Sequence, residues 1–177
     1  MIFGVMEAID TILREELETL KTSISNNMRA AGQVASGRTL ASMNVVVGDN
    51  EGTLYGGLPD GAPIGTFETG RRAGAVPADF PAVILEWMNV KGIQAEPIPY
   101  VRQPSERWQP KYSPQERGQR ALAGAIAHKI ETQGTKLYRE GGRSDIYTPE
   151  IDKTVNRISD RIMMGMELEI DSINSKL

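Results

Sequence analysis

Two long amphipathic segments, one toward each end of the 177-residue chain, constrain the fold more than any other feature. In residues 4–34 apolar side chains recur every three or four positions, which is the period of an α-helix. They are Ile9, Leu13, Leu17, Leu20, Ile24 and Met28. Residues 149–174 repeat the pattern with Ile151, Val155, Ile158, Ile162, Met166, Ile170 and Ile173. Because helices of this kind owe most of their stability to packing, each must lie on a sheet or on a partner chain.

Residues 43–69 change to a pattern typical of strands. The β-branched run MNVVVG, the polar turn GDNEG and the return segment TLYGG predict a hairpin over residues 44–57. A second turn cluster, LPDGAP, leads into PIGTFETG, which we interpret as a third strand that ends at Phe67–Gly70. A small antiparallel sheet is therefore expected.

A short apolar helix is expected over residues 79–91, DFPAVILEWMNVK. Asp79 is a suitable N-cap, Pro81 lies in the first turn and Gly92 is the stop signal. Its apolar face is predicted to comprise Val83, Ile84, Trp87 and Met88. We expect Trp87 to dock this helix on the rest of the protein.

A second shorter helix begins at the sequence SPQE. Ser113, Pro114 and Glu116 form a capping-box pattern, and Gly134 is the stop signal. Strands and helices are segregated along the chain, so an α+β fold is predicted: a small antiparallel sheet packed against long N- and C-terminal helices, plus two shorter helices. We expect residues 1–177 to form a single domain.

The segment between the two shorter helices, residues 94–112, contains four prolines and is expected to be an extended arm. Its cations and aromatic residues are interleaved: Arg102, Arg107, Trp108 and Tyr112. Such residues can stack on single-stranded bases, or they can anchor the arm on a neighbouring subunit. We favour the subunit interface, because Trp, Tyr and Arg are the usual interface anchors.

Residues that carry catalytic chemistry are sparse. The chain has no cysteine and one histidine, His128, which is expected on a helix surface. Glycine-rich GGLPDGAPIG lacks the Lys-Ser/Thr of a phosphate-binding loop, and the acidic clusters fall on the polar sides of helices. We predict no catalytic residues, no metal site and no cofactor. No segment resembles a signal peptide or a membrane span, so we expect a protein made in the cytoplasm that contacts no membrane.

The net charge of −3 does not suggest strong sequence-independent binding to nucleic acid. Arg71 and Arg72 stand out locally, in the turn after Gly70. They could hold a phosphate backbone, a carboxylate on a neighbouring subunit, or only water.

The ordered set of motifs resembles the tail-completion, or neck, proteins of tailed bacteriophages. The match runs from FETGRRAGAVPADFPAVILEWMNVKGI through RALAGAIAHKIETQGTK to DIYTPEIDKTVNRISDRI, roughly residues 64–165. The residues that carry it are Glu68, Gly70, Arg71, Arg72, Pro77, Trp87, Lys91, Gly92, Ile93, Ile126, Ala127, Ile130, Gly134, Thr135, Tyr147 and Pro149. The proline-rich insert at 94–112 is longer than the family pattern leads us to expect.

The resemblance implies a structural virion protein that forms a ring at the head–tail joint and connects the portal or adaptor to the tail, without catalysis. Its partners would be sister copies in a homo-oligomer ring, the portal or adaptor and tail proteins, and passing DNA through non-specific contact. In this interpretation Glu68, Gly70, Pro77, Trp87 and Gly92 shape the turn and dock the helix. Arg71 and Arg72 either make pairs between subunits or line the DNA channel; we favour the pairs, because a channel through which DNA slides needs few tight phosphate contacts.

Two other functions stay open at the level of sequence. One is a small nucleic-acid-binding module that uses the basic residues at 71–72 and 102–112. The other is an enzyme with a pocket near Glu68, Arg71 and His128.

Overall fold

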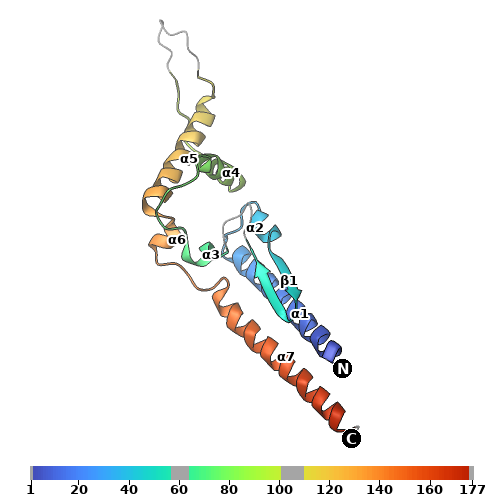
Figure 1. The fold of residues 1–177 in the computed structure, drawn as a ribbon. Helices are drawn as coiled ribbons and strands as arrows, with labels where there is room; N and C mark the ends of the chain where they lie inside the picture. Colours follow the sequence, from blue (N-terminus) through green and yellow to red (C-terminus); the bar gives the residue numbers. More distant parts are fainter. Residues whose placement is uncertain (1, 57–63, 101–109, 176–177) are drawn as a thin grey trace. The chain divides into compact units, whose positions relative to one another are not determined.

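The computed structural model describes residues 2–56, 64–100 and 110–175. Where a single domain was expected, the chain divides into two compact units. Unit 1 comprises residues 1–68 and 143–177, and unit 2 comprises residues 69–142. Each unit has its own cluster of buried apolar side chains. The α+β fold with long terminal helices and a small antiparallel sheet is confirmed (Figure 1).

Unit 1 begins with α1 (Ile2–Ala30), which confirms the predicted N-terminal helix. The helix ends at Gly32, whose φ is +66°. The Gln33 N–H donates to the Met28 carbonyl at 3.0 Å and the Gly32 N–H to that of Arg29, also at 3.0 Å. This is the glycine-dependent C-cap that the sequence indicated.

The hairpin is also confirmed. β1 (Asn44–Gly48) pairs antiparallel with β2 (Glu51–Tyr55) in a two-stranded sheet. Both loop residues, Asp49 and Asn50, have positive φ, as a two-residue turn that follows the twist of the strands requires. The hairpin lies on α1, and the core between them contains Leu17, Leu20, Ile24, Met28, Met43, Val45 and Ile146.

The predicted third strand is wrong. Residues 57–63 lie outside the described part of the chain, and the segment that follows forms a turn and the short helix α3 (Thr66–Thr69). The N–H groups of Phe67 and Glu68 donate to carbonyls three residues earlier, those of Ile64 and Gly65. The apolar residues of the segment, Ile64 and Phe67, are three positions apart in the sequence. This spacing fits a helical turn better than alternation along a strand. A second short helix, α2 (Arg38–Ala41), follows Gly37.

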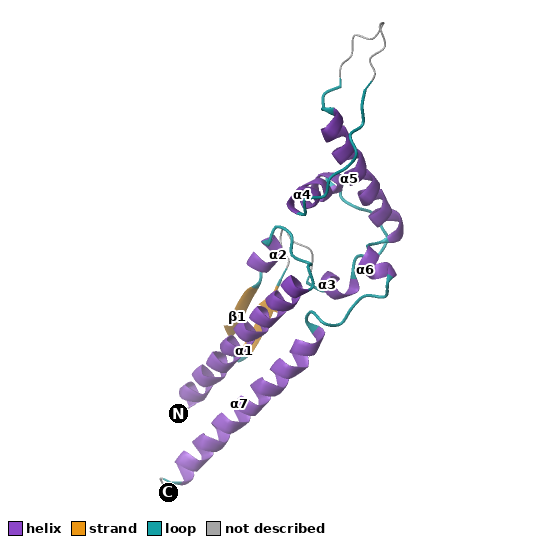
Figure 2. Cartoon of the chain, turned by 180° about the vertical axis from the view of Figure 1, so that it is seen from behind, coloured by secondary structure: helices purple, strands orange, loops and turns teal. Residues whose placement is uncertain are grey.

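The second long helix, α7 (Thr148–Asn174), confirms the predicted C-terminal helix. It lies beside α1 and runs in the opposite direction (Figures 1 and 2). Tyr147 is the N-cap residue of this helix, and its own side chain makes no capping hydrogen bond.

Unit 2 contains α4 (Phe80–Val90), α5 (Pro114–Gln133) and the short helix α6 (Lys136–Arg139). Ile84 and Met88 of α4 pack against Ala123 and Ala127 of α5, whose small side chains permit a close approach. The capping box at Ser113 and Glu116 is present as predicted.

Gly92 ends α4 as predicted. Its φ is +67°, and the following residue, Ile93, donates its N–H to the Met88 carbonyl at 2.9 Å. Asp79 is the N-cap residue, but its side chain makes no capping hydrogen bond.

The described ends of the proline-rich segment, residues 94–100 and 110–112, have no regular secondary structure, as expected of an arm. The first part is nevertheless held along α5. The Ile98 N–H donates to the Pro114 carbonyl at 2.9 Å, and a Cβ at Gly118 would lie 2.0 Å from the Glu96 carbonyl oxygen. Gly118 is therefore required for this close approach.

Candidate subunit-interface site

A buried carboxylate, Glu68, fixes the start of α7. The residue is only 3% exposed. Its Oε1 accepts the backbone N–H groups of Ile146 at 2.8 Å, Tyr147 at 2.8 Å and Thr148 at 3.0 Å, and its Oε2 accepts the Thr148 hydroxyl at 2.5 Å. The carboxylate therefore caps the helix from a distant part of the sequence, where negative charge is also favoured by the helix dipole. We call this arrangement the Glu68 clasp.

The electrostatics of the clasp favour the charged carboxylate. Burial by itself would raise the pKa of Glu68, but the hydrogen bonds from the Thr148 hydroxyl and from the three backbone N–H groups outweigh it and lower that pKa. Burial, together with the charge of Glu68, raises the pKa of Tyr147. Since both carboxylate oxygens already accept hydrogen bonds, Glu68 is a structural residue and not a general base.

The clasp also joins the two ends of the chain that enclose unit 2. The Arg143 N–H donates to the Glu68 carbonyl at 2.8 Å. The chain thus leaves unit 1 after Glu68 and re-enters it at Arg143, and these two residues are hydrogen-bonded to each other.

An ion-pair network connects α1 with α7 further along α7 from the clasp. Arg157 Nε donates to Glu16 at 2.7 Å, and Arg161 donates to Glu16 at 2.9 Å and to Glu15 at 2.6 Å. The hydrogen bond from Arg157 and the nearby Arg161 lower the pKa of the buried Glu16 despite its desolvation. Sequence reasoning placed these acidic residues only on a polar helix face. The signal that it missed is the i, i+4 spacing of Arg157 and Arg161 on the partner helix.

In unit 2 the turn after Gly70 is built as a close crossing. Gly70 has a φ of +69°, and a Cβ there would lie 2.4 Å from the Tyr138 nitrogen. The Arg71 N–H donates to the Thr135 hydroxyl at 2.9 Å, and the Thr135 N–H donates to the Arg71 carbonyl at 2.8 Å. A Cβ at Gly134 would lie 2.7 Å from that same carbonyl oxygen. The close approach at this crossing therefore depends on two glycines and one threonine.

The two arginines of the turn have different surroundings. The Arg71 guanidinium donates to the Ala75 carbonyl at 2.6 Å and lies over the Phe80 ring, 5.4 Å from its centroid. Arg71 is therefore engaged within its own unit. Arg72 is exposed, so it is the better candidate for a contact with another molecule. Pro77 is exposed in the same loop, and its carbonyl accepts the Phe80 N–H at 3.0 Å where the chain enters α4.

The predicted arm residues are only partly described. Arg102, Arg107 and Trp108 lie outside the described residues. Tyr112 is half-buried, with the Arg120 guanidinium 4.0 Å from its ring centroid and the Lys111 amine 5.5 Å from it. Tyr112 thus packs with cations of its own unit.

The apolar stripe of α7 is mostly uncovered. Ile158 and Ile162 are half-buried, and the only fully buried residue of the helix is Thr154. The remaining stripe positions are between 42% and 57% exposed. They are Ile151, Val155, Met166, Ile170 and Ile173, which we call the α7 face. In unit 1 the helix packs on α1 through its arginine-bearing side, and its α7 face is left without a cover.

The expectation that Trp87 docks α4 is wrong. The α4 helix packs through Ile84 and Met88, whereas Trp87 is 39% exposed. Val83 and Val90, four residues before and three after Trp87, are exposed as well. We call these three side chains the α4 face. Its i, i+4, i+7 spacing with a central Trp is typical of a helix that enters an apolar groove.

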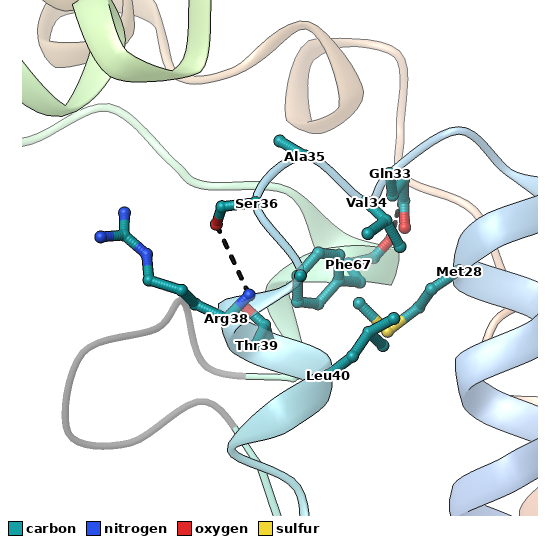
Figure 3. Close-up of a pocket in the computed structure, with 10 residues that line it drawn as sticks. Met28, Gln33, Val34, Ala35, Ser36, Arg38, Thr39, Leu40 and Phe67 are labelled. Carbon is teal, nitrogen blue, oxygen red and sulfur yellow. Dashed lines mark hydrogen bonds between the residues drawn. The ribbon is translucent and has the colours of Figure 1, made fainter. Parts of the chain in front are cut away.

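One pocket and the single histidine are the remaining candidates for a ligand site among the described residues. A pocket of about 100 Å³ lies in unit 1 between the end of α1 and α2, where Phe67, Met28 and Leu40 face one another and the Arg38 side chain extends away (Figure 3). Pockets for small organic ligands are larger, about 300–1,000 Å³. His128 is exposed and lies 3.7 Å from Glu131, one turn along the same helix.

Within the described ranges, no three His, Asp or Glu side chains converge as metal ligands would. None of the helices in that part of the chain is long and apolar enough to cross a membrane.

Comparisons with protein-family models, with curated proteins and with solved structures gave no match to this chain.

Proposed function

We propose that this chain is a structural subunit of a tailed-bacteriophage virion that forms a ring at the head–tail joint, between the portal or adaptor and the tail. The observation that carries the proposal is the α7 face. Five large apolar side chains repeat along a helix of 27 residues and are about half exposed. Exposed apolar surface of this extent marks an interaction site.

Two further features support an assembly role without catalysis. The Glu68 clasp and the ion pairs between α1 and α7 fix the helix that presents this face. Two carboxylates with lowered pKa values, Glu16 and Glu68, are held in structural contacts, and neither lines the pocket of Figure 3. An uncovered apolar face on a helix that is fixed within its unit is suited to contacts with sister copies and with neighbouring virion proteins.

Electron microscopy and sedimentation of the purified chain test this proposal. Rings of uniform diameter are expected, with an exposed Arg72 placed to contact a neighbouring copy or passing DNA. The alternative, a nucleic-acid-binding module, predicts a monomer that retards DNA in a gel, with an affinity that falls steeply as salt rises. A monomer at all concentrations would contradict the ring.

A further inference from the structure

The two units of the chain carry opposite net charges. Unit 2 has eleven Lys and Arg residues against seven Asp and Glu, a net charge of +4. Unit 1 has nine against sixteen, a net charge of −7, and the two values add to the −3 of the whole chain. The acidic character extends to the α7 helix, whose last two described turns contain Glu167, Glu169 and Asp171 but no described basic residue.

Each unit also presents one uncovered apolar helix face. Unit 1 has the α7 face, and unit 2 has the α4 face of Val83, Trp87 and Val90. The two faces together contain eight exposed apolar side chains, five on α7 and three on α4, and exposed apolar patches mark interaction sites. The α7 face is aliphatic and contains Met166, a flexible side chain that adapts to an aromatic partner such as Trp87.

We propose that sister copies associate head to tail, with the α4 face of one copy packed on the α7 face of the next. This inference rests on the proposed ring and names its contact. A ring with one repeated contact needs two different, complementary patches on every copy. The opposite charges of the units select this pairing: two α7 faces would bring together two units of −7, and two α4 faces two units of +4, whereas α4 on α7 joins unlike charges.

Two exposed substitutions separate this pairing from a self-pairing face. Val90→Asp places a charge on the α4 face and Met166→Asp places one on the α7 face. Asn89→Asp and Asn156→Asp are matched controls, since each adds the same charge to the same helix at an exposed position that lies off the apolar face. Circular dichroism should show that all four variants keep the wild-type helix content, because surface changes seldom unfold a protein.

Sedimentation or mass photometry then gives the answer. Wild type and both controls are expected to form the same closed oligomer, and each face variant alone to lose it by at least tenfold in apparent affinity. An equal mixture of the two face variants should form dimers and stop there, because the Val90→Asp chain keeps an intact α7 face and the Met166→Asp chain an intact α4 face. Association should also weaken as salt rises, because the attraction between the unlike units is screened.

Other outcomes overturn the inference in distinguishable ways. Rings that survive either face substitution place the contact elsewhere and leave the proposed function standing. A face variant that still forms a dimer on its own indicates a self-pairing face, and face variants that stay monomeric when mixed show that the two faces do not bind each other; in either case the head-to-tail contact is wrong. A wild-type chain that is monomeric at every concentration contradicts both proposals. If that monomer binds DNA, the net positive charge of unit 2 contributes to nucleic-acid binding and not to contacts between copies.

Discussion

Removing the carboxylate of Glu68 should strongly lower the free energy of unfolding of unit 1, because the side chain is buried. Glu68→Ala leaves the N–H groups of Ile146, Tyr147 and Thr148 without their acceptor. A buried donor without a partner costs about 1–3 kcal/mol. The Ile146 donor is fully buried and the other two are partly buried. If the buried donor bears the full cost and water recovers part of the other two, the free energy of unfolding falls by about 3–5 kcal/mol.

Glu68→Gln separates the contribution of the negative charge from that of the hydrogen bonds. The amide oxygen can still accept the three N–H groups and the amide NH₂ can donate to the Thr148 hydroxyl, so the loss is that of the charge, about 1–2 kcal/mol. Glu18→Ala is the matched control in unit 1, because Glu18 is exposed and pairs with Lys21 at 3.2 Å along the same helix. That control should change stability by about 0.5 kcal/mol or less.

The pH dependence of the free energy of unfolding tests whether the charge of Glu68 is the cause of this stabilisation. The pKa of Glu68 is lowered from 4.5 in the folded chain, so its stabilisation is fully present above pH 4.5 and is lost as pH falls through the folded pKa. The stability gap between wild type and Glu68→Gln should therefore shrink on acidification below that pH. Chemical denaturation with hydrogen exchange at α7 measures the gap in unit 1 alone. A Glu68→Ala chain as stable as the Glu18→Ala control, or a gap that widens on acidification, would refute the reasoning.

Three further predictions concern the α1–α7 ion pairs and the two elements of unit 2. Glu16→Ala, which removes the buried acceptor shared by two arginines, should lower unfolding free energy by about 1–3 kcal/mol, and Glu15→Ala, at the exposed edge, by under about 0.5 kcal/mol in the same denaturation assay. Met88→Ala should cost about 2–5 kcal/mol because the side chain is completely buried, whereas Trp87→Ala should cost under about 1.5 kcal/mol; a larger loss for Trp87 would show that its ring is covered. Gly118→Ala should release residues 94–98 from α5, seen as faster hydrogen exchange at Ile98 with the helix itself retained.

Local patterns were sufficient for the four longer helices, α1, α4, α5 and α7, and for the hairpin. The stripe from Ile9 to Met28 and the stop at Gly32 depend on residues within a few turns of one another, so sequence alone places them. The same is true of the Ser113 capping box. The Asp49–Asn50 turn is equally local, since only its two central residues need positive φ.

Long-range contacts were the part that sequence could not supply. The carboxylate of Glu68 meets the Ile146 N–H across 78 positions of sequence, and no periodic pattern encodes such a pair. Without that contact the segment around Phe67 resembles a strand. The division into two units was missed for the same reason, because a unit inserted between two hydrogen-bonded residues leaves no gap in composition.

Trp87 shows a different limit of prediction from sequence. The α4 helix has apolar residues on two sides, one with Ile84 and Met88 and one with Trp87, Val83 and Val90. Size alone suggested that the tryptophan is buried, since large aromatic residues dominate the energetics of cores. The observed choice depends on Ala123 and Ala127 of α5, whose small side chains accept the slim edge of α4 and not its indole.

The clasp makes the assembly experiments interpretable. Glu68 and Arg143 close unit 1 by a direct backbone hydrogen bond at the point where the chain departs into unit 2 and returns. A substitution on the α4 face therefore leaves the contacts that hold α7 untouched, and a substitution at Glu68 leaves the α4–α5 core untouched. Because effects at sites without shared partners add, loss of assembly from Val90→Asp cannot arise through a loosened α7. If Glu68→Ala abolishes assembly while Val90→Asp does not, the contact requires the ordered start of α7 and not the α4 face.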